Sequence, residues 1–412
     1  MTSIETRQSW FVAFTALAVM SIAYGAPFVT VVALKPIAGE LGSARSVPAL
    51  AYSLAWLGAA FGGIGMWRIA DRIGVRWTVA FGAVMIGVGL VVSTGTSTWR
   101  LWVGHGLFIG LLGNAGINAP LYIYVSRWFD RRRGTALALI SSGQYVAGAI
   151  WPSIFERGID LIGWRQTMIW FAVVEAVLVV PMALAVLSAP PEAPLLGTAA
   201  SGPLPGSRVL GLPPNLALGL LAMAAFMCCV PMAMPQGHLV AFCTDLGITP
   251  SHGAAMLSVL LGSAFVSRQF WGWVSDRIGG LRTVLAGSLC QIVALVGLLV
   301  TQDEAGLFAV AAFFGLGFSG MIPAYVLAIR ELFPASEAAW RVPSLLLFSG
   351  SGMAAGGWLA GVLYDHFGFY GAAFGTGIVF NLANIAIVGS LVFRLRQTLR
   401  EVLAEVPGQP AE

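Results

Sequence analysis

The chain has 412 residues, of which 58% are hydrophobic and only 10% are charged, and its formal net charge is +4. A soluble domain usually carries about 25% charged residues, so the composition excludes a soluble enzyme or binding domain with a polar surface. The basic excess does not indicate a nucleic-acid partner either, because it falls mainly in short loops between apolar segments.

Twelve apolar segments follow one another along the chain. They cover residues 10–34, 47–67, 77–97, 101–125, 134–155, 166–188, 215–240, 253–274, 283–301, 307–329, 342–363 and 371–393. Each is long enough to cross a bilayer as a helix, and none has the short alternating pattern of a membrane β-strand. The first is too long for the core of a signal peptide, so we expect it to be retained. The sequence therefore predicts an all-α membrane protein with twelve transmembrane helices.

The basic residues are distributed unequally between the two sides of the membrane. With the N-terminus inside, 16 of the 22 lie in inside loops and tails, 5 lie outside, and one, Arg268, lies within a span. Basic residues concentrate on the cytoplasmic side of membrane proteins. We therefore expect a multi-pass protein of a bacterial-type inner membrane with both termini in the cytoplasm.

One long loop divides the chain. Residues 189–214 contain seven prolines together with Gly, Ala and Ser, a composition that forms a semi-stiff linker and not a packed core. We therefore expect an N-terminal six-helix bundle over 1–188, a cytoplasmic linker over 189–214, a C-terminal six-helix bundle over 215–394 and a cytoplasmic tail over 395–412.

The two halves repeat one another. Asp71-Arg72-Ile73-Gly74 after the second segment matches Asp276-Arg277-Ile278-Gly279 after the eighth, at an offset of 205 residues. Pro120-Leu121-Tyr122 in the fourth segment matches Pro323-Ala324-Tyr325 in the tenth, at an offset of 203. Transporters built from such repeats place their substrate site between them.

The stretch from Gly272 to Arg282 resembles the loop signature of the major facilitator superfamily, which is Gly, three residues, Asp-Arg, any residue, Gly and then a basic residue. The first copy departs from it, since Trp67 stands where glycine is usual. The resemblance covers the whole chain and implies two six-helix bundles related by a pseudo-two-fold axis, and transport by alternating access. It also implies that a conformational latch joins the helix ends at these loops, formed by Asp71, Arg72, Asp276, Arg277, Arg127 and Arg330.

Within that superfamily, the chain looks most like the monocarboxylate transporter and oxalate–formate antiporter branch. Three places carry this likeness: the run from Arg127 to Gly134 with Gly163-Trp164-Arg165 after it, the stretch from Gln236 to Gly247, and Ser267-Arg268. At the position of Arg268, members of this branch have an arginine that binds the substrate carboxylate. Ala264 and Phe28 stand where its proton-coupled members have an acid and a lysine, so their proton relay is not copied here.

Arg268 itself is expected near the middle of the membrane. It precedes the boundary residue Asp276 by eight residues, about 12 Å of helix, and the hydrocarbon half-thickness is about 15 Å. An arginine at that depth costs at least ~2.5–3.5 kcal/mol. We interpret it as a binding site for the carboxylate of a small organic monocarboxylate, which its planar fork suits. A structural pair with Glu175 or with backbone carbonyls is the alternative.

Other polar residues in the spans are candidate contacts for the substrate. Asn114, Asn118 and Tyr122 lie four residues apart and form one stripe of a helix. The full set of expected substrate contacts is Arg268, Asn118, Tyr122, Tyr325, Gln144, Tyr145, Gln236 and His238. For Asn118, Tyr122, Gln144 and Tyr145, hydrogen bonding between helices is the alternative, and for His238 the alternative is an interfacial histidine at a helix end.

Proton-coupled transport would require a titratable group, and the candidates are Glu175, His238 and His105. A carboxyl group in hydrocarbon is expected to carry its proton, because burial disfavours the charged form. Helix packing is the alternative for Glu175, and the substrate itself could supply the proton. Proton symport and anion exchange both stay open.

An efflux carrier of the same fold for drug-like amphipathic compounds is the alternative function. Apolar side chains of the seventh segment would suit a hydrophobic substrate cavity. They are Met223, Phe226, Met227, Met232 and Met234. A membrane sensor without transport is a further alternative. No nucleophile–base pair or metal-ligand spacing is visible, so we expect no enzyme activity, cofactor or metal. We expect a monomer surrounded by membrane lipid.

Overall fold

The computed structural model describes residues 5–129, 132–188 and 208–404. The greater part of the predicted linker, residues 189–207, and the last residues of the predicted tail, 405–412, lie outside this described part. The described residues form a nearly all-helical fold.

The first half of the chain contains α1 (Arg7–Ala23), α2 (Gly25–Val32), α3 (Leu34–Glu40), α4 (Ser46–Ile73), α5 (Val75–Ser93), α6 (Thr98–Val103), the π-helix η1 (Gly104–Asn114), α7 (Ala115–Ser126), α8 (Arg133–Ser141) and α9 (Gly143–Val186). The second half contains α10 (Pro214–Asp245), α11 (Pro250–Ile278), α12 (Gly280–Val300), α13 (Glu304–Phe318), α14 (Met321–Leu332), α15 (Ala335–Phe367) and α16 (Gly371–Ala404).

The helices account for the twelve predicted spans. Ten helical stretches of the described chain are long and apolar enough to cross a membrane. One of them, over residues 134–186, contains two spans, because Gly163 adopts φ 78° and ψ 161° and breaks α9 into two helices. The twelfth is α11, which has 29 residues but a lower mean hydropathy, because it carries polar side chains such as Arg268 and Gln269. The all-α membrane fold is thus confirmed.

The backbone confirms the internal repeat. Six glycines with positive φ form three pairs, each 205 residues apart: Gly42 with Gly247, Gly74 with Gly279, and Gly163 with Gly368. A positive φ costs a glycine little and any other residue more, so each pair marks one turn that both halves need. After the second pair, Thr78 and Thr283 each donate a hydroxyl hydrogen bond to the carbonyl of the preceding glycine, at 3.1 and 2.8 Å.

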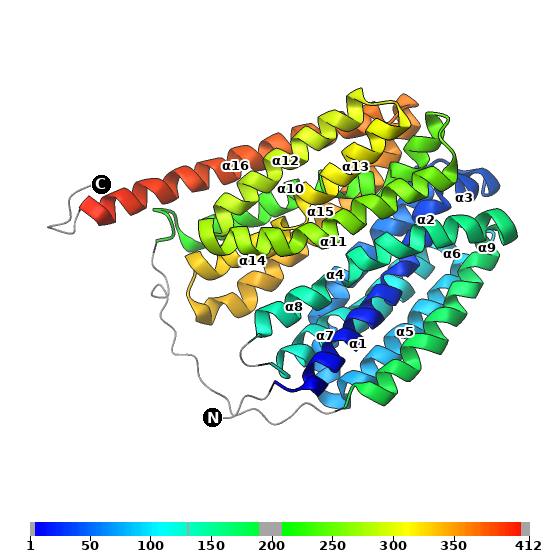
Figure 1. Cartoon of the computed structure of the whole chain (residues 1–412), viewed down its shortest axis with the longest axis horizontal. Coiled ribbons are helices and arrows are strands. Elements are labelled where there is room, and N and C mark those ends of the chain that lie inside the picture. The colour runs from blue at the N-terminus through cyan, green and yellow to red at the C-terminus, as the bar shows by residue number, and fades with distance from the viewer. Residues whose placement is uncertain (1–4, 130–131, 189–207, 405–412) are drawn as a thin grey trace.

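The two halves form two bundles that lie side by side (Figure 1). The beginning of α1 and the end of α16 lie at the same end of the molecule, which we call the terminal end. The opposite end, with α3 and the turns after α10 and α15, is the distal end.

The bundles meet through α4 with α15 and through α9 with α11. Gly357 of α15 packs against Tyr52 of α4, where a Cβ on the glycine would come within 3.1 Å of the tyrosine ring. Ser153 of α9 and Ser258 of α11 form a hydrogen bond of 3.1 Å. The ion pairs of Asp245 in the second bundle with Lys35 and Arg45 in the first bundle join the bundles at the distal end. The molecule is therefore closed at its distal end.

Candidate functional site

Arg268 of α11 lies at the interface between the bundles. Its side chain is partly buried, and its guanidinium carbon is 5.2 Å from the ring centroid of Tyr145 in the opposite bundle. The hydroxyl of Tyr122 is within electrostatic reach of the same guanidinium. Within the described part of the chain, no carboxylate forms an ion pair with Arg268, and the alternative pair with Glu175 is not formed. This site therefore holds a cation with vacant donors, which suits an anionic ligand.

Asn118 and Tyr122 lie on one stripe of α7, as predicted. The Asn118 amide nitrogen donates to the hydroxyl of Tyr24 at 2.6 Å. The amide oxygen of Asn118 is buried and has no hydrogen-bond partner among the described residues. The amide nitrogen of Asn118 is thus bonded within its own bundle, while its amide oxygen can still accept a hydrogen bond from a substrate.

A small cavity lies between the bundles on the distal side of Arg268. Its volume is about 10 Å³, roughly what one water molecule needs. Both halves of the chain contribute to its wall, which consists of Tyr24, Pro27, Phe28, Tyr52, Trp56, Gln144, Tyr145, Gln236 and Leu261. The cavity therefore brings together three predicted residues, Gln144, Tyr145 and Gln236.

Tyr325 lies elsewhere. Its side chain is 0% exposed within the second bundle, and its hydroxyl donates to Asn384 of α16 at 2.6 Å. Asn384 in turn donates to the hydroxyl of Ser288 at 2.7 Å. The structure thus joins Tyr325 to a polar network inside its own bundle and does not bring it to Arg268, although its repeat partner Tyr122 lies there.

His238 lies at the distal end, where it links α10 to α15 and to Tyr370 in the turn before α16. One ring nitrogen, Nε2, is 2.8 Å from the carbonyl oxygen of Gly357, and Nδ1 is 3.1 Å from the hydroxyl of Tyr370. A carbonyl only accepts, so Nε2 carries the proton. Nδ1 of the neutral ring then accepts from the Tyr370 hydroxyl.

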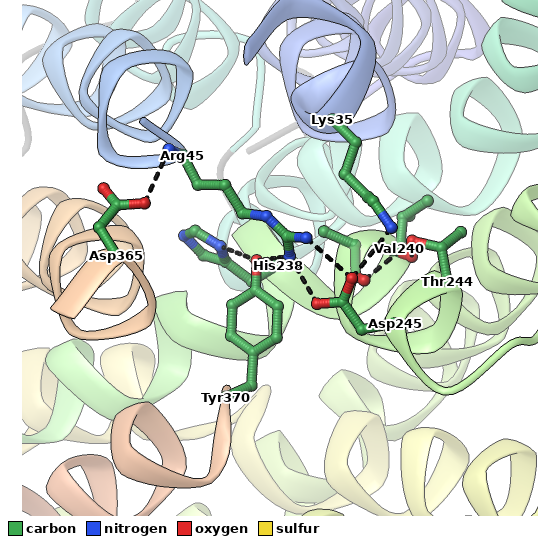
Figure 2. Close-up of polar contacts among 9 residues, drawn as sticks. Lys35, Arg45, His238, Val240, Thr244, Asp245, Asp365 and Tyr370 are labelled. Atoms are coloured by element: carbon green, nitrogen blue, oxygen red, sulfur yellow. Dashed lines mark hydrogen bonds and ion pairs between the residues drawn. The ribbon is translucent and has the colours of Figure 1, made fainter. Parts of the chain in front are cut away.

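Charged groups close the distal end across the two bundles (Figure 2). Two nitrogens of Arg45 bind the Asp245 carboxylate at 2.6 and 2.8 Å, and Lys35 binds it at 2.9 Å. The carboxylate of Asp365 accepts the backbone amides of Arg45 and Ser46 at 2.8 and 2.9 Å. We call the group of Lys35, Arg45, Asp245, Asp365, Tyr370 and His238 the distal lock.

Arg45 is the centre of the distal lock. Besides Asp245 it donates to the Tyr370 hydroxyl at 3.2 Å, and its guanidinium lies 3.7 Å from the ring centroid of Tyr364. Partial burial alone would lower the pKa of Arg45, but the hydrogen bonds to Asp245 and Tyr370 outweigh it and raise that pKa above its ordinary value. Arg45 therefore stays charged at any physiological pH.

The other two proton-coupling candidates lie inside the first bundle. Glu175 of α9 is fully buried, and neither carboxylate oxygen has a hydrogen-bond partner among the described residues. His105 of η1 is also fully buried, with Nε2 2.5 Å from the Thr30 hydroxyl and Nδ1 3.0 Å from the Ser93 hydroxyl. Neither residue lines the cavity.

The predicted latch residues lie at the terminal end. Arg127 binds Asp71 at 2.9 Å, and both belong to the first bundle. In the second bundle, Arg277 stacks on the ring of Trp273 with 3.8 Å between guanidinium carbon and centroid. Glu331, one residue beyond Arg330, accepts the amide of Gly280 at 3.0 Å. Among the described residues, Arg72, Asp276 and Arg330 form no ion pair, so the two loops are held by different contacts.

Sequence reasoning singled out only His238 among the residues of the distal lock, and it missed four aromatic residues of the cavity wall. Lys35 and Arg45 are two of the five basic residues expected on the outside, and their scarcity there is the one sequence signal that could have indicated ion pairs. Tyr24, Phe28, Tyr52 and Trp56 carry no signal in the sequence, because aromatic residues occur throughout membrane helices.

The chain matches the family model of the Major Facilitator Superfamily over residues 10–301 and 216–412. Among curated proteins, the MFS-type transporter pynF of Aspergillus niger is 24% identical over 328 residues, which cover 77% of this chain and 74% of that protein. Monocarboxylate transporter 13 of Bos taurus is 26% identical over 326 residues, which cover 78% of this chain and 75% of that protein.

Solved structures share the fold. A POT family transporter in complex with 5-aminolevulinic acid superposes with a TM-score of 0.73 at 15% identity, over 93% of this chain and 96% of that one. A bacterial homologue of the human lysosomal transporter Spinster, in an inward-facing and occupied conformation, superposes with a TM-score of 0.67 at 15% identity, over 95% of this chain and 96% of that one.

Proposed function

This chain belongs to the Major Facilitator Superfamily and is a multi-pass membrane transporter, not an enzyme, and on that premise we propose that it carries a small organic monocarboxylate. The observation that carries the proposal is Arg268, a cation at the bundle interface with no carboxylate partner among the described residues. A cation inside a membrane protein is costly without a counter-ion, so a site that keeps one gains most from an anionic substrate.

The neighbours of Arg268 can orient such a substrate. The guanidinium fork would bind both carboxylate oxygens, while the hydroxyl of Tyr122 and the amide of Asn118 would contact polar groups beside it. Tyr145 would keep the guanidinium in place by its ring contact. One cation without a second one nearby favours a monocarboxylate over a dicarboxylate.

Transport would proceed by alternating access between the two bundles. The basic residues are concentrated at the terminal end, so this end would face the cytoplasm of a bacterial-type inner membrane, and the closed distal end would face outward. The state described here would then be inward-facing. Opening outward would break the distal lock, while Asp71, Arg72, Arg127, Asp276, Arg277 and Arg330 would form the latch at the terminal end. The protein would work as a monomer, with proton symport or anion exchange as its coupling.

Efflux of amphipathic compounds is the second candidate. Five aromatic rings line the cavity, and the relatives include fungal MFS-type transporters such as pynF. Such a carrier would gain its binding energy from apolar area, so its substrates would not depend on the charge of Arg268.

The test is the thermal stabilisation of the purified protein by a panel of monocarboxylates, run beside Arg268→Gln and Arg268→Lys. A ligand that binds only the folded state raises the melting temperature. We expect some carboxylates to stabilise the wild type and, more weakly, Arg268→Lys, but not Arg268→Gln. Equal stabilisation of all three by amphipathic cations or neutral compounds, with none by carboxylates, would establish the second candidate instead.

A further inference from the structure

The wall of the cavity next to Arg268 is aromatic. Five of its residues are Tyr24, Phe28, Tyr52, Trp56 and Tyr145. Several of the rings contact one another: the Tyr24 and Trp56 centroids are 6.1 Å apart, and Tyr52 meets Trp56 edge to face at 6.4 Å. Such a wall favours a flat apolar group, because rings pack edge to face or offset on one another.

Two polar atoms in this wall have no hydrogen-bond partner among the described residues. They are the hydroxyl of Tyr52, whose side chain is 2% exposed, and the indole nitrogen of Trp56. The Trp56 indole lies within reach of a weak hydrogen bond to the Tyr52 oxygen, but no well-aligned hydrogen bond joins the two atoms. A buried polar group without a partner costs about 1–3 kcal/mol, so a ligand or a water molecule is needed to complete the pair. The indole can only donate, whereas the hydroxyl can also accept.

Tyr145 connects this polar pair to the carboxylate site. Its ring faces the guanidinium of Arg268 on the one side and forms part of the cavity wall on the other. A substrate held by Arg268 would therefore extend past Tyr145 into the aromatic cavity. The cavity wall belongs to both bundles, since Gln236 and Leu261 come from the second, so separation of the bundles would enlarge it from its present water-sized volume.

We propose that the transported monocarboxylate carries an aromatic ring with a hydroxyl group at the end away from the carboxylate. The carboxylate binds Arg268, the ring packs among Tyr24, Phe28 and Trp56, and the hydroxyl accepts from the Trp56 indole and donates to the Tyr52 oxygen. This inference rests on the proposed function, because it needs a carboxylate at Arg268, and it adds the chemistry of the rest of the substrate.

The experiment measures binding of acetate, cyclohexanecarboxylate, benzoate and 4-hydroxybenzoate to the purified full chain by isothermal titration calorimetry. The informative variant is Tyr52→Phe, which removes one oxygen and keeps the ring. The matched control is Tyr124→Phe, because the Tyr124 hydroxyl bonds the carbonyl of Ser188 outside the cavity. We expect 4-hydroxybenzoate to bind most tightly, benzoate next, and acetate at least about tenfold more weakly than benzoate.

Tyr52→Phe should weaken 4-hydroxybenzoate about three- to tenfold and leave benzoate unchanged, and Tyr124→Phe should change neither. If acetate binds as tightly as benzoate, or if Tyr52→Phe weakens both aromatic acids equally, the inference is wrong while a carboxylate site remains. If no carboxylate binds the wild type, or if Arg268→Gln binds them all equally well, the proposed function fails and the inference fails with it.

Discussion

Glu40 and Asp245 stand at equivalent positions of the two halves, 205 residues apart, yet Glu40 binds a cation of its own bundle and Asp245 binds cations of the other bundle. Glu40 binds Arg165 and the indole of Trp164, which belong to its own bundle. Asp245 binds Arg45 of the other bundle, because the position equivalent to Arg165 is Tyr370, which has no charge to offer. The same acid therefore strengthens one bundle in the first half and joins two bundles in the second.

This asymmetry predicts different effects for two matched substitutions. Asp245→Asn should shift the equilibrium toward the distal-open state by about tenfold, because it weakens the charged hydrogen bonds across the bundles by about 1–2 kcal/mol after allowance for their partial exposure. Glu40→Gln should lower the melting temperature and leave that equilibrium unchanged. The equilibrium between the distal-closed and distal-open states would be measured from distances between spin labels at Ala44 and Ser251, which lie on the distal ends of opposite bundles. Equal shifts in both variants would contradict the assignment.

Arg268→Gln should keep or raise the stability of the ligand-free protein. The guanidinium has no carboxylate partner in the described chain, so its removal relieves a desolvated charge without leaving another one unpaired. The measurement is the melting temperature without substrate, beside Arg341→Gln as the control. Arg341 is 2% exposed and bound to Glu337 at 2.6 Å, so its loss should be destabilising. A fall for Arg268→Gln as large as that of the control would make Arg268 a structural residue.

Acid on the distal side should open the distal lock through His238. In the closed state Nε2–H donates to Gly357 and Nδ1 accepts from Tyr370, whose oxygen already accepts from Arg45. A second proton would place a donor against that hydroxyl and a positive charge near Arg45. The acids that face it are occupied, Asp245 by Arg45 and Lys35, and Asp365 by two amides.

A second proton on the ring is incompatible with the Tyr370 contact of the closed state, so a lower pH should favour opening. An exposed histidine titrates near pH ~6.5. The Ala44–Ser251 distance distribution should therefore shift to longer values between about pH 8 and pH 5.5 in the wild type and stay constant in His238→Gln. A shift of the same size in that variant would assign the response to another group.

Glu175→Gln should leave stability and transport close to those of the wild type. Both carboxylate oxygens lack a partner among the described residues, which fits a neutral acid packed between helices, and the amide has nearly the same volume. Glu175→Ala is the informative comparison, because it leaves a cavity and should lower the melting temperature by several degrees. Loss of proton-driven uptake in Glu175→Gln, with binding retained, would instead give Glu175 a role in coupling.

The fold could be predicted from the sequence alone, because a chain that crosses a lipid bilayer can satisfy its backbone hydrogen bonds only as helices or as a closed barrel. Twelve apolar segments and the repeated Asp-Arg-x-Gly loops predicted the helices, and the structure placed the breaks at glycines with positive φ. Hydropathy alone does not single out α11 as a span, because the helix that carries Arg268 is less apolar than the ten other stretches.

The candidate site could be predicted only in part. Arg268, Asn118 and Tyr122 were recognisable because polar groups in a membrane helix are costly and must be compensated. Tyr325 and His238 share that property, but their partners Asn384 and Gly357 satisfy them within the protein, and the sequence does not distinguish a satisfied polar group from a vacant one. Trp56 could not be recognised because an aromatic residue is common in a membrane helix and, unlike a polar one, has no cost there that a binding site would explain.

Asp365 caps the beginning of α4 from the other bundle, because its carboxylate accepts the amides of Arg45 and Ser46. Whenever the distal end opens, these two amides lose that carboxylate and meet solvent, and the first turn of α4 loses the stabilisation that a carboxylate gives to a helix N-terminus. Their hydrogen-exchange rates would thus follow the opening of the protein directly, with no label attached to the chain. Each transport cycle would fray and rebuild one helical turn.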